Sequence, residues 1–356
     1  MYIVIMAGGR GTRFWPLSKG SLPKQLLKLI NNRTMLQLTV ERVIPVAKPE
    51  NIFIVTNIDH AKEVSRQLPF IPKKNILQEP IGKNTAACIG LSAIYINRID
   101  PNGKMIVLPS DHYITDPVNL KKLLISIDQS LDEMDYLFTI GFKPTYPETG
   151  YGYIQTGEKI KKTGSHQIYK VKNFVEKPDL ETAKKYFKNK AFLWNSGIFG
   201  WKVETILKEI KKFLPSLFRG LQEIDTSLGK PQAFKVIKKV YGSFENISID
   251  YGVMEKSSKI AIIPAQIHWK DVGSWNSLEE FLKKDSMNNA IAGKSVLIDT
   301  KNSIIFGTDQ LIAALGVKDL IIVQAGGVVF VCHKKRSQEV KRIISALEER
   351  NLKDYL

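Results

Sequence analysis

The chain has 356 residues, of which 44% are hydrophobic and 24% charged, and its formal net charge is +17. This composition predicts a globular protein with one large or two unequal domains and excludes a disordered chain. No apolar run reaches the about 20 residues that span a bilayer. The first apolar run, residues 2–6, is too short for a signal peptide. We therefore expect no membrane partner.

The positive charge could mark a polyanion partner such as nucleic acid. The lysines are instead scattered along the exposed faces of expected helices, with no basic stripe, no interleaved aromatic residues and no nucleic-acid motif. We expect a lysine-rich surface that favours anionic substrates, and no nucleic-acid partner. The two cysteines, Cys88 and Cys332, lie far apart in apolar surroundings. They are expected to be packed thiols, which fits a reducing cytoplasm.

A short strand and a glycine-rich loop open the chain. Residues 2–6 (YIVIM) are apolar and β-branched enough for a buried strand, and Gly8, Gly9 and Gly11 follow directly. Glycines let backbone N–H groups approach an anion, and Arg13 and Lys24 add two cations. The loop lacks the Gly-Lys-Ser/Thr of a Walker A motif and the third glycine of a dinucleotide fingerprint. The pattern favours phosphate binding over the alternative, a plain strand-to-helix turn.

Strands and helices alternate through residue 140. We expect strands at 52–56, 76–80, 105–108 and 137–140, and helices at 35–46, 84–96 and 118–131, with Asn84 and Thr85 capping the second helix. This alternation predicts an α/β fold with a Rossmann-like, mixed but mostly parallel sheet covered by helices on both faces. Ligands of such sheets bind at the carboxyl ends of the strands. The glycine loop, Glu79-Pro80 and Asp111 all lie at such ends.

The pattern changes after about residue 145. Residues 149–153 are turn-rich and aromatic, strands are expected at 171–176, 192–199 and 260–263, and helices at 179–187, 203–214 and 275–281. Residues 285–289 are polar and suit a linker. Beyond them, short β-branched runs at 295–298, 303–306, 320–323 and 328–331 precede a helix at 337–347. We expect a domain at 1–284 and a small β-rich domain at 285–356, without a clean hexapeptide repeat.

Two aspartates are candidate metal ligands. Asp111 follows a strand beside Ser110 and His112, and Asp271 lies in the segment WKDVGSW. Mg²⁺ prefers oxygen ligands and commonly uses one or two carboxylates together with substrate phosphates. The alternative for each aspartate is a turn or helix-cap role, and the sequence does not show that the two meet. His112 is expected to orient the loop, and Asp250 to cap a helix.

Five segments resemble mannose-1-phosphate guanylyltransferases, in that family's order. They are the loop with 15–18 (WPLS) and 23–25 (PKQ), then 108–112 (LPSDH), 174–178 (FVEKP), 194–199 (WNSGIF) and 271–275 (DVGSW). Phe14 and Leu26 stand where that family more often has leucine and phenylalanine, and both exchanges keep an apolar residue. The resemblance implies the nucleotidyltransferase fold and cytoplasmic synthesis of GDP-mannose.

The resemblance also implies roles for individual residues. Asp111 and Asp271 would hold Mg²⁺, and Arg13 and Lys24 would hold phosphates, so that these four residues form the catalytic set. The nucleotide would contact Ala7, Gly8, Gly9, Gly11, Thr12, Arg13, Glu79, Pro80, Asn84 and Thr85. The sugar phosphate would contact Gly150, Glu176, Lys177 and Asn195. Without the resemblance, Glu176-Lys177 could equally be a solvated pair and Asn195 a strand-edge amide.

The expected reaction is transfer of GMP from GTP to mannose 1-phosphate, with release of pyrophosphate by direct displacement. No arrangement of Cys, Ser or His suggests a covalent intermediate. The alternatives are another sugar 1-phosphate, such as a heptose phosphate, another nucleotide, or a non-catalytic binding subunit of the same fold. Some members of the family carry a further isomerase domain, which this chain of 356 residues is not expected to include. The family's C-terminal region is also associated with dimer contacts, so a homodimer is one possible assembly.

Overall fold

The computed structural model describes residues 1–9, 11–20 and 22–356. Backbone contacts divide the chain into two compact units, and each unit is assembled from segments that are distant in the sequence. Unit 1 comprises Met1–Gly8, Thr39–Ser110 and Ile114–Trp269, and unit 2 comprises Gly9–Leu38, Asp111–Tyr113 and Lys270–Leu356. The sequence predicted two continuous domains that meet between residues 284 and 285, whereas the two units are each made of several segments. The predicted domain division stays a prediction.

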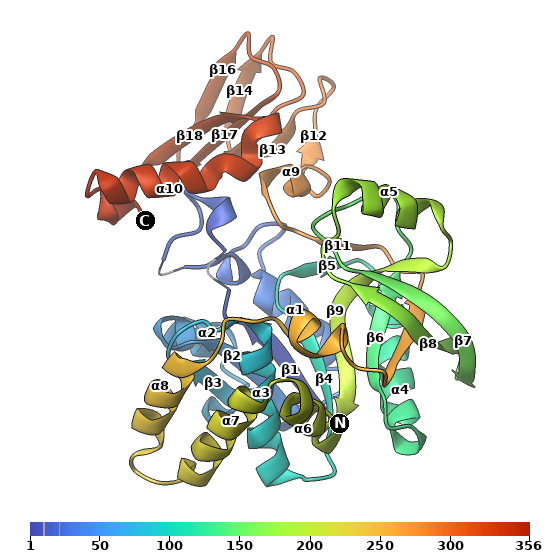
Figure 1. Cartoon of the computed structure of the whole chain (residues 1–356). Coiled ribbons are helices and arrows are strands. Elements are labelled where there is room, and N and C mark those ends of the chain that lie inside the picture. Colours follow the sequence, from blue (N-terminus) through green and yellow to red (C-terminus); the bar gives the residue numbers. More distant parts are fainter. Residues whose placement is uncertain (10, 21) are drawn as a thin grey trace. The chain divides into compact units, whose positions relative to one another are not determined.

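Unit 1 contains a nine-stranded mixed sheet with the strand order β3-β2-β1-β4-β9-β6-β10-β8-β7 (Figure 1). The pairs β1–β2, β1–β4, β2–β3 and β6–β10 are parallel, and the remaining pairs are antiparallel. The strands are β1 (Tyr2–Ala7), β2 (Ile52–Asn57), β3 (Ile76–Glu79), β4 (Lys104–Pro109), β6 (Leu137–Phe142), β7 (Tyr153–Thr163), β8 (His166–Val175), β9 (Phe192–Lys202) and β10 (Ile260–Ala265). The predicted α/β class with a mixed sheet is confirmed. The sheet was also expected to be mostly parallel, but among the described strands its five antiparallel pairs outnumber the four parallel ones, because β7, β8 and β9 pair antiparallel with their neighbours.

Helices cover both faces of this sheet. Ile3, Val4 and Ile5 of β1 are all fully buried, as expected for a strand covered on both sides. One face packs against a layer of four helices that contact one another: α3 (Asn84–Ile99), α6 (Val203–Phe213), α7 (Pro215–Ser227) and α8 (Ala233–Ser243). Helix α4 (Pro117–Glu133) contacts β4, β7 and β9. The remaining helices of unit 1 are α2 (Ala61–Gln67) and α5 (Leu180–Lys188), and α1 (Met35–Val43) spans the boundary between the units.

The sequence pattern did not indicate the hairpin β7–β8 or the helices α7 and α8. The turn-rich residues 149–153 lead into β7, an eleven-residue strand whose outer half carries charged, exposed side chains. A strand that is solvated along much of its length shows little hydrophobic alternation, and the hydrophobic pattern is the main signal for a strand. The first helix also ends at Val43, earlier than expected.

A bulge in β9 shapes the segment WNSGIF. On β6, Thr139 pairs with Phe199 and Gly141 with Asn195, so β9 has extra residues between these two pairs. Gly197 lies in this bulge with φ 67°, a left-handed conformation that favours glycine. The bulge turns the Gly197 N–H toward the Asn195 side chain, at a distance of 3.2 Å from Oδ1. The local backbone therefore fixes how Asn195 is presented.

Unit 2 contains short strands in mostly parallel pairs. Its five-stranded sheet has the order β12-β13-β15-β17-β18, and β14 pairs with β16 in a second sheet (Figure 1). The parallel strands β13, β15 and β17 are separated by unequal numbers of residues, because Ala290 pairs with Ile304 and Ile304 pairs with Ile321. This unequal spacing explains why the sequence shows no six-residue repeat. The strands are β12 (Lys283–Lys284), β13 (Ala290–Ala292), β14 (Ser295–Ile298), β15 (Ile304–Gly307), β16 (Ile312–Leu315), β17 (Leu320–Ala325) and β18 (Val328–His333).

Aromatic side chains pack the N-terminal segment of unit 2, which contains Phe14, against the β-rich part of the same unit. The ring of Trp275 lies 5.3 Å from the ring of Phe14 and 5.3 Å from that of Phe306, measured between centroids. Trp275 opens α9 (Trp275–Leu278), which is shorter than expected, and the final helix α10 (Val340–Glu349) begins later than expected. None of the helices in the described part of the chain combines the length and hydrophobicity that a bilayer crossing requires.

A buried carboxyl group lies at the end of β3 in unit 1. Glu79 is 4% exposed, and the hydroxyl of Tyr241 on α8 donates to its Oε1 at 2.6 Å. Burial raises the pKa of Glu79 to about 7, although the hydrogen bond from Tyr241 partly opposes this. The folded chain therefore holds a proton on Glu79 at pH values where an unfolded chain has released it.

We predict that Glu79 makes unit 1 less stable as the pH rises. The pKa is about 7 in the folded chain against an ordinary value of 4.5, so its contribution to stability is complete below pH 4.5 and is lost as the pH rises through 7. One pKa unit corresponds to about 1.4 kcal/mol, which gives a loss on the order of 3 kcal/mol. Glu79→Gln, which still accepts from Tyr241, should lose less stability than the unmodified chain between about pH 5 and about pH 8 in urea unfolding. Equal losses in the two proteins would contradict the prediction.

Candidate active site

The glycine loop in unit 2 is held against Lys24. Gly11 has φ 57°, and a Cβ at this position would lie 2.6 Å from the backbone nitrogen of Lys24. Only glycine therefore fits here. The side chain of Gln25 donates to the Gly9 carbonyl at 2.9 Å and fastens the start of the loop. Arg10 lies outside the described residues.

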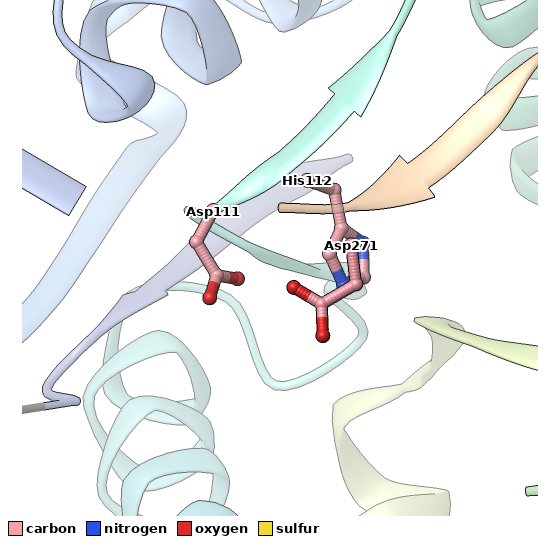
Figure 2. A group of neighbouring side chains, drawn as sticks. All are labelled: Asp111, His112 and Asp271. Carbon is pink, nitrogen blue, oxygen red and sulfur yellow. The ribbon is translucent and has the colours of Figure 1, made fainter. Parts of the chain in front are cut away.

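Two paired strands bring Asp111 and Asp271 together. Asp111 directly precedes β5 (His112–Ile114), Asp271 ends β11 (Trp269–Asp271), and these strands form a two-stranded sheet. Figure 2 shows the two carboxylates and the ring of His112 next to one another. One ligand atom from each of the three residues lies within 4.8 Å of the others. The described residues thus contain a group that could hold a metal ion.

The ammonium group of Lys24 bridges the two aspartates. Lys24 Nζ lies 2.7 Å from Asp111 Oδ2 and 3.1 Å from Asp271 Oδ1. The Lys24 side chain is 7% exposed, whereas those of Asp111 and Asp271 are 36% and 31% exposed. The two carboxylates thus lie close enough to share a positive charge, and their oxygens are the donors that a hard divalent ion prefers.

Electrostatics keep Lys24 and Asp111 charged. Burial by itself raises the pKa of Asp111, but the Lys24 ammonium and His112 outweigh it and lower the pKa to about 2. Burial likewise opposes the charge on Lys24, but the carboxylates of Asp111 and Asp271 raise its pKa above the ordinary value. Lys24 and Asp111 therefore both stay ionised at neutral pH.

A cavity of about 240 Å³ lies beside this centre in unit 2. Arg13 borders it and donates to the Gly273 carbonyl at 3.3 Å. Lys341, on α10, adds a third cation to its wall. A small polar cavity with three cations and two carboxylates suits a phosphate group together with a divalent ion. The full lining is Gly11, Thr12, Arg13, Lys24, Asp111, Asp271, Gly273 and Lys341.

A second polar group, in unit 1, unites three of the predicted sugar-phosphate residues. Glu176 follows β8, and its Oε1 lies 3.1 Å from Lys177 Nζ. Asn195 on β9 donates through Nδ2 to Asp250 Oδ1 at 2.8 Å. Burial and the neighbouring Asp250 raise the pKa of Glu176 to about 7, although Lys177 opposes this. Gly150 is exposed, and its N–H donates to Glu148 at 2.7 Å.

The residues predicted to contact the nucleotide are divided between the units. Gly9, Gly11, Thr12 and Arg13 belong to unit 2, whereas Ala7 and Gly8, at the end of β1, and Glu79, Pro80, Asn84 and Thr85 belong to unit 1. Asn84 has φ 65°, and its side chain accepts from the Thr85 N–H at 2.9 Å. The hydroxyl of Thr85 accepts from the Ile249 N–H at 2.8 Å.

Asp250 and Lys341 were not predicted as residues of the site. Asp250 lies far along the chain from Asn195, and an aspartate before a tyrosine is no motif by itself. Lys341 is one lysine among many, and only the fold of unit 2 brings it to the cavity wall. No local signal in the sequence distinguishes either residue from a surface charge.

Comparison with known proteins places these features in a family. Residues 2–288 match the nucleotidyl transferase family, and residues 293–347 match the mannose phosphate isomerase/GMP-like β-helix domain. A mannose-1-phosphate guanylyltransferase of Escherichia coli is 36% identical over 99% of this chain and 76% of its own length. The xanthan biosynthesis protein XanB of Xanthomonas campestris is 38% identical over 97% of this chain and 73% of its own. The chain thus spans about three quarters of the length of these relatives.

A solved structure agrees with these matches. The crystal structure described as a mannose-1-phosphate geranyltransferase from Thermus thermophilus superposes with a TM-score of 0.85 at 32% identity, covering 98% of this chain and 99% of that one. The resemblance expected from the sequence motifs is confirmed. The chain is therefore an enzyme of the nucleotidyl transferase family, in the branch of the mannose-1-phosphate guanylyltransferases.

Proposed function

We propose that this chain transfers GMP from GTP to α-D-mannose 1-phosphate, giving GDP-mannose and pyrophosphate. One observation carries most of the proposal: Lys24 lies between Asp111 and Asp271 beside a cavity with further cations. This arrangement suits the binding of phosphates together with a metal ion. The names of the relatives from Escherichia coli and Klebsiella pneumoniae support mannose 1-phosphate as the acceptor.

The reaction is a direct in-line displacement. A phosphate oxygen of mannose 1-phosphate attacks the α-phosphorus of GTP, and the bond from that phosphorus to the oxygen bridging to the β-phosphorus breaks. The attacking oxygen is already anionic, so no general base is needed. Catalysis then consists of positioning the two substrates and neutralising charge.

The charged residues of unit 2 supply this neutralisation. Arg13 and Lys341 face the cavity and pair with the departing pyrophosphate, and Lys24 pairs with the α-phosphate. Asp111 and Asp271 would hold Mg²⁺, since their carboxylate oxygens lie together and are ligands that this ion prefers. When bound, this ion supplies positive charge to the phosphate oxygens. The backbone of the glycine loop, with Gly9, Gly11 and Thr12, cradles the phosphates.

The residues of unit 1 bind the organic parts of the substrates. Glu176, Lys177 and Asn195 line the sugar-phosphate site, with the backbone of Gly150. Pro80, Asn84 and Thr85 contact the guanosine, and Ala7 and Gly8 contact the nucleotide at the start of the glycine loop. Because the Glu79 carboxyl group is bonded to Tyr241, we assign the contact of Glu79 with the base to its backbone.

The proposal also covers the cellular compartment, the domain division and the oligomeric state of the protein. We place the enzyme in the cytoplasm, because Cys88 and Cys332 are free thiols and a reducing compartment preserves such groups. We divide the chain into a catalytic domain, 1–284, and a C-terminal domain, 285–356. A homodimer formed through the C-terminal domain is the assembly that the family resemblance favours.

The test is pyrophosphate release with GTP, mannose 1-phosphate and Mg²⁺, set against ATP, UTP and glucose 1-phosphate. We expect the first combination to be the fastest. Faster release with another sugar phosphate, a heptose phosphate included, or with another nucleotide would overturn the assigned specificity. Binding of both substrates without any pyrophosphate release would instead favour a non-catalytic subunit.

A charge-neutral substitution isolates the role of Asp111. Asp111→Asn keeps the shape of the side chain but leaves the Lys24 ammonium with Asp271 as its remaining carboxylate. We expect turnover to fall about 100- to 1,000-fold, the range found when one group that stabilises transition-state charge is removed. Asp299→Asn, an equal change of charge at an exposed bend of unit 2, serves as the control. Near-normal turnover of folded Asp111→Asn at saturating Mg²⁺ would refute the assignment.

A further inference from the structure

We propose that Asp250 is a positioning residue of the sugar-phosphate site, whose carboxyl group fixes the amide of Asn195 in the orientation that contacts the sugar. This inference rests on the proposed function, in which Asn195 and Glu176 contact the sugar phosphate. It adds a residue that the sequence predicted only to cap a helix.

Hydrogen bonds leave one orientation for the Asn195 amide. The Gly197 N–H, which can only donate, lies 3.2 Å from Asn195 Oδ1, so the oxygen must face it. The Thr139 hydroxyl donates to the same oxygen at 3.2 Å. The amide nitrogen therefore points to Asp250 Oδ1, which accepts at 2.8 Å. One of the two N–H groups is held by Asp250, and the second makes no hydrogen bond to any residue that the structure describes.

The fold holds Asp250 in place from both sides. Asp250 opens the short helix η6 (Asp250–Met254), and its neighbours Ile249, Val253 and Met254 are fully buried in the core of unit 1. The Ile249 N–H also donates to the hydroxyl of Thr85 at 2.8 Å. The backbone around Asp250 is thus held by buried neighbours and by the Ile249–Thr85 hydrogen bond. A substitution of the Asp250 side chain leaves these contacts intact.

Glu176 presents an acceptor that lacks a protein partner. Its side chain is 8% exposed, and among the described residues its buried Oε2 atom has no hydrogen-bond partner. A Cβ at Gly152 would lie 2.3 Å from this oxygen and 3.2 Å from Asn195 Cβ, so glycine at 152 is what allows both side chains to pack this closely against the backbone. Burial of an unpaired polar atom is unfavourable, and a hydroxyl donor from a ligand would remove that cost.

The charges around Glu176 favour a hydroxyl-bearing ligand at the carboxyl groups and a phosphate at Lys177. The groups that act on Glu176 are Asp250 and Glu255 from the η6 segment and the adjacent Lys177. Burial and Asp250 raise the pKa of Glu176, and burial raises that of Asp250. With its pKa at about 7, the carboxyl group of Glu176 can both donate to and accept from sugar hydroxyls around neutral pH. Lys177, whose side chain is 55% exposed, is the cation that a phosphate can reach.

Steady-state kinetics with GTP, mannose 1-phosphate and Mg²⁺ test the proposal. Asp250→Ala should raise the KM for mannose 1-phosphate about tenfold, as expected for loss of a charge-assisted hydrogen bond, and change the KM for GTP less than about twofold. Asp250→Asn still offers an acceptor to Asn195 and should stay within about threefold of the unmodified enzyme. Asp225→Ala, a surface change on α7, is the matched control.

A double-mutant cycle shows whether Asp250 acts through Asn195. Asn195→Ala combined with Asp250→Ala should be no more than about twofold worse in KM for mannose 1-phosphate than Asn195→Ala alone. Effects of the two substitutions that multiply independently would overturn the positioning role. An unchanged KM for mannose 1-phosphate in Asp250→Ala would overturn it as well.

The outcomes separate this proposal from the proposed function. If the unmodified chain releases no pyrophosphate, the proposed function fails, and calorimetric binding of mannose 1-phosphate to the unmodified chain and Asp250→Ala then tests Asp250 directly. Affinity about tenfold weaker in Asp250→Ala would support the positioning role, and equal affinity would overturn it. If the unmodified chain is active and Asp250→Ala has unchanged kinetics, the proposed function stands and the role of Asp250 is wrong.

Discussion

The buried ammonium group of Lys24 is the constraint on which unit 2 depends. A buried cation is stable only when counter-charges and hydrogen bonds replace its water, and here Asp111 and Asp271 supply both. Gly11 allows the backbone of Lys24 to approach the loop, and the pairing of β5 with β11 brings the aspartates together. The aromatic packing of Phe14, Trp275 and Phe306 fixes these segments within one core.

The two polar centres use carboxyl groups in opposite ways. Beside Lys24, the pKa of Asp111 falls to about 2 despite burial, so the group stays anionic and can hold a cation. In unit 1, the half-exposed Lys177 acts on both Glu176 and Asp250, but burial raises the pKa of both. One environment suits metal and phosphate, and the other suits sugar hydroxyls. Identical chemical groups thus receive different roles from their neighbours.

Local patterns in the sequence predicted much of the fold. The buried strands β1, β2 and β4 and the helices α3, α4 and α6 were expected near their observed positions, because each shows an unbroken apolar run or a clear helical period. The exposed half of β7 lacks such a pattern, and no pattern led us to expect α7 or α8. Unit 2 is assembled from three separate segments. No local sequence pattern predicts this assembly, because it depends on packing between residues far apart in the chain.

The candidate site was predictable only where motifs mark it. Asp111 and Asp271 were chosen because each lies in a motif, and the structure brings their oxygens to the same ammonium group. Asp250 and Lys341 lie in segments without any such mark, and their roles arise from side-chain contacts across the fold. The sequence predicted the carboxyl group of Glu79 at a ligand-binding strand end, but its bond to Tyr241 depends on a helix that the sequence did not predict.

Binding of Mn²⁺, followed by electron paramagnetic resonance, tests most directly whether the two aspartates form a metal centre. Mn²⁺ takes the oxygen ligands that Mg²⁺ takes. The unmodified chain should bind Mn²⁺ in the presence of GTP, and Asp271→Asn should weaken this binding at least about tenfold, because a carboxylate ligand is lost. Equal binding by the unmodified chain and folded Asp271→Asn would show that the metal lies elsewhere and would contradict the centre described around Lys24.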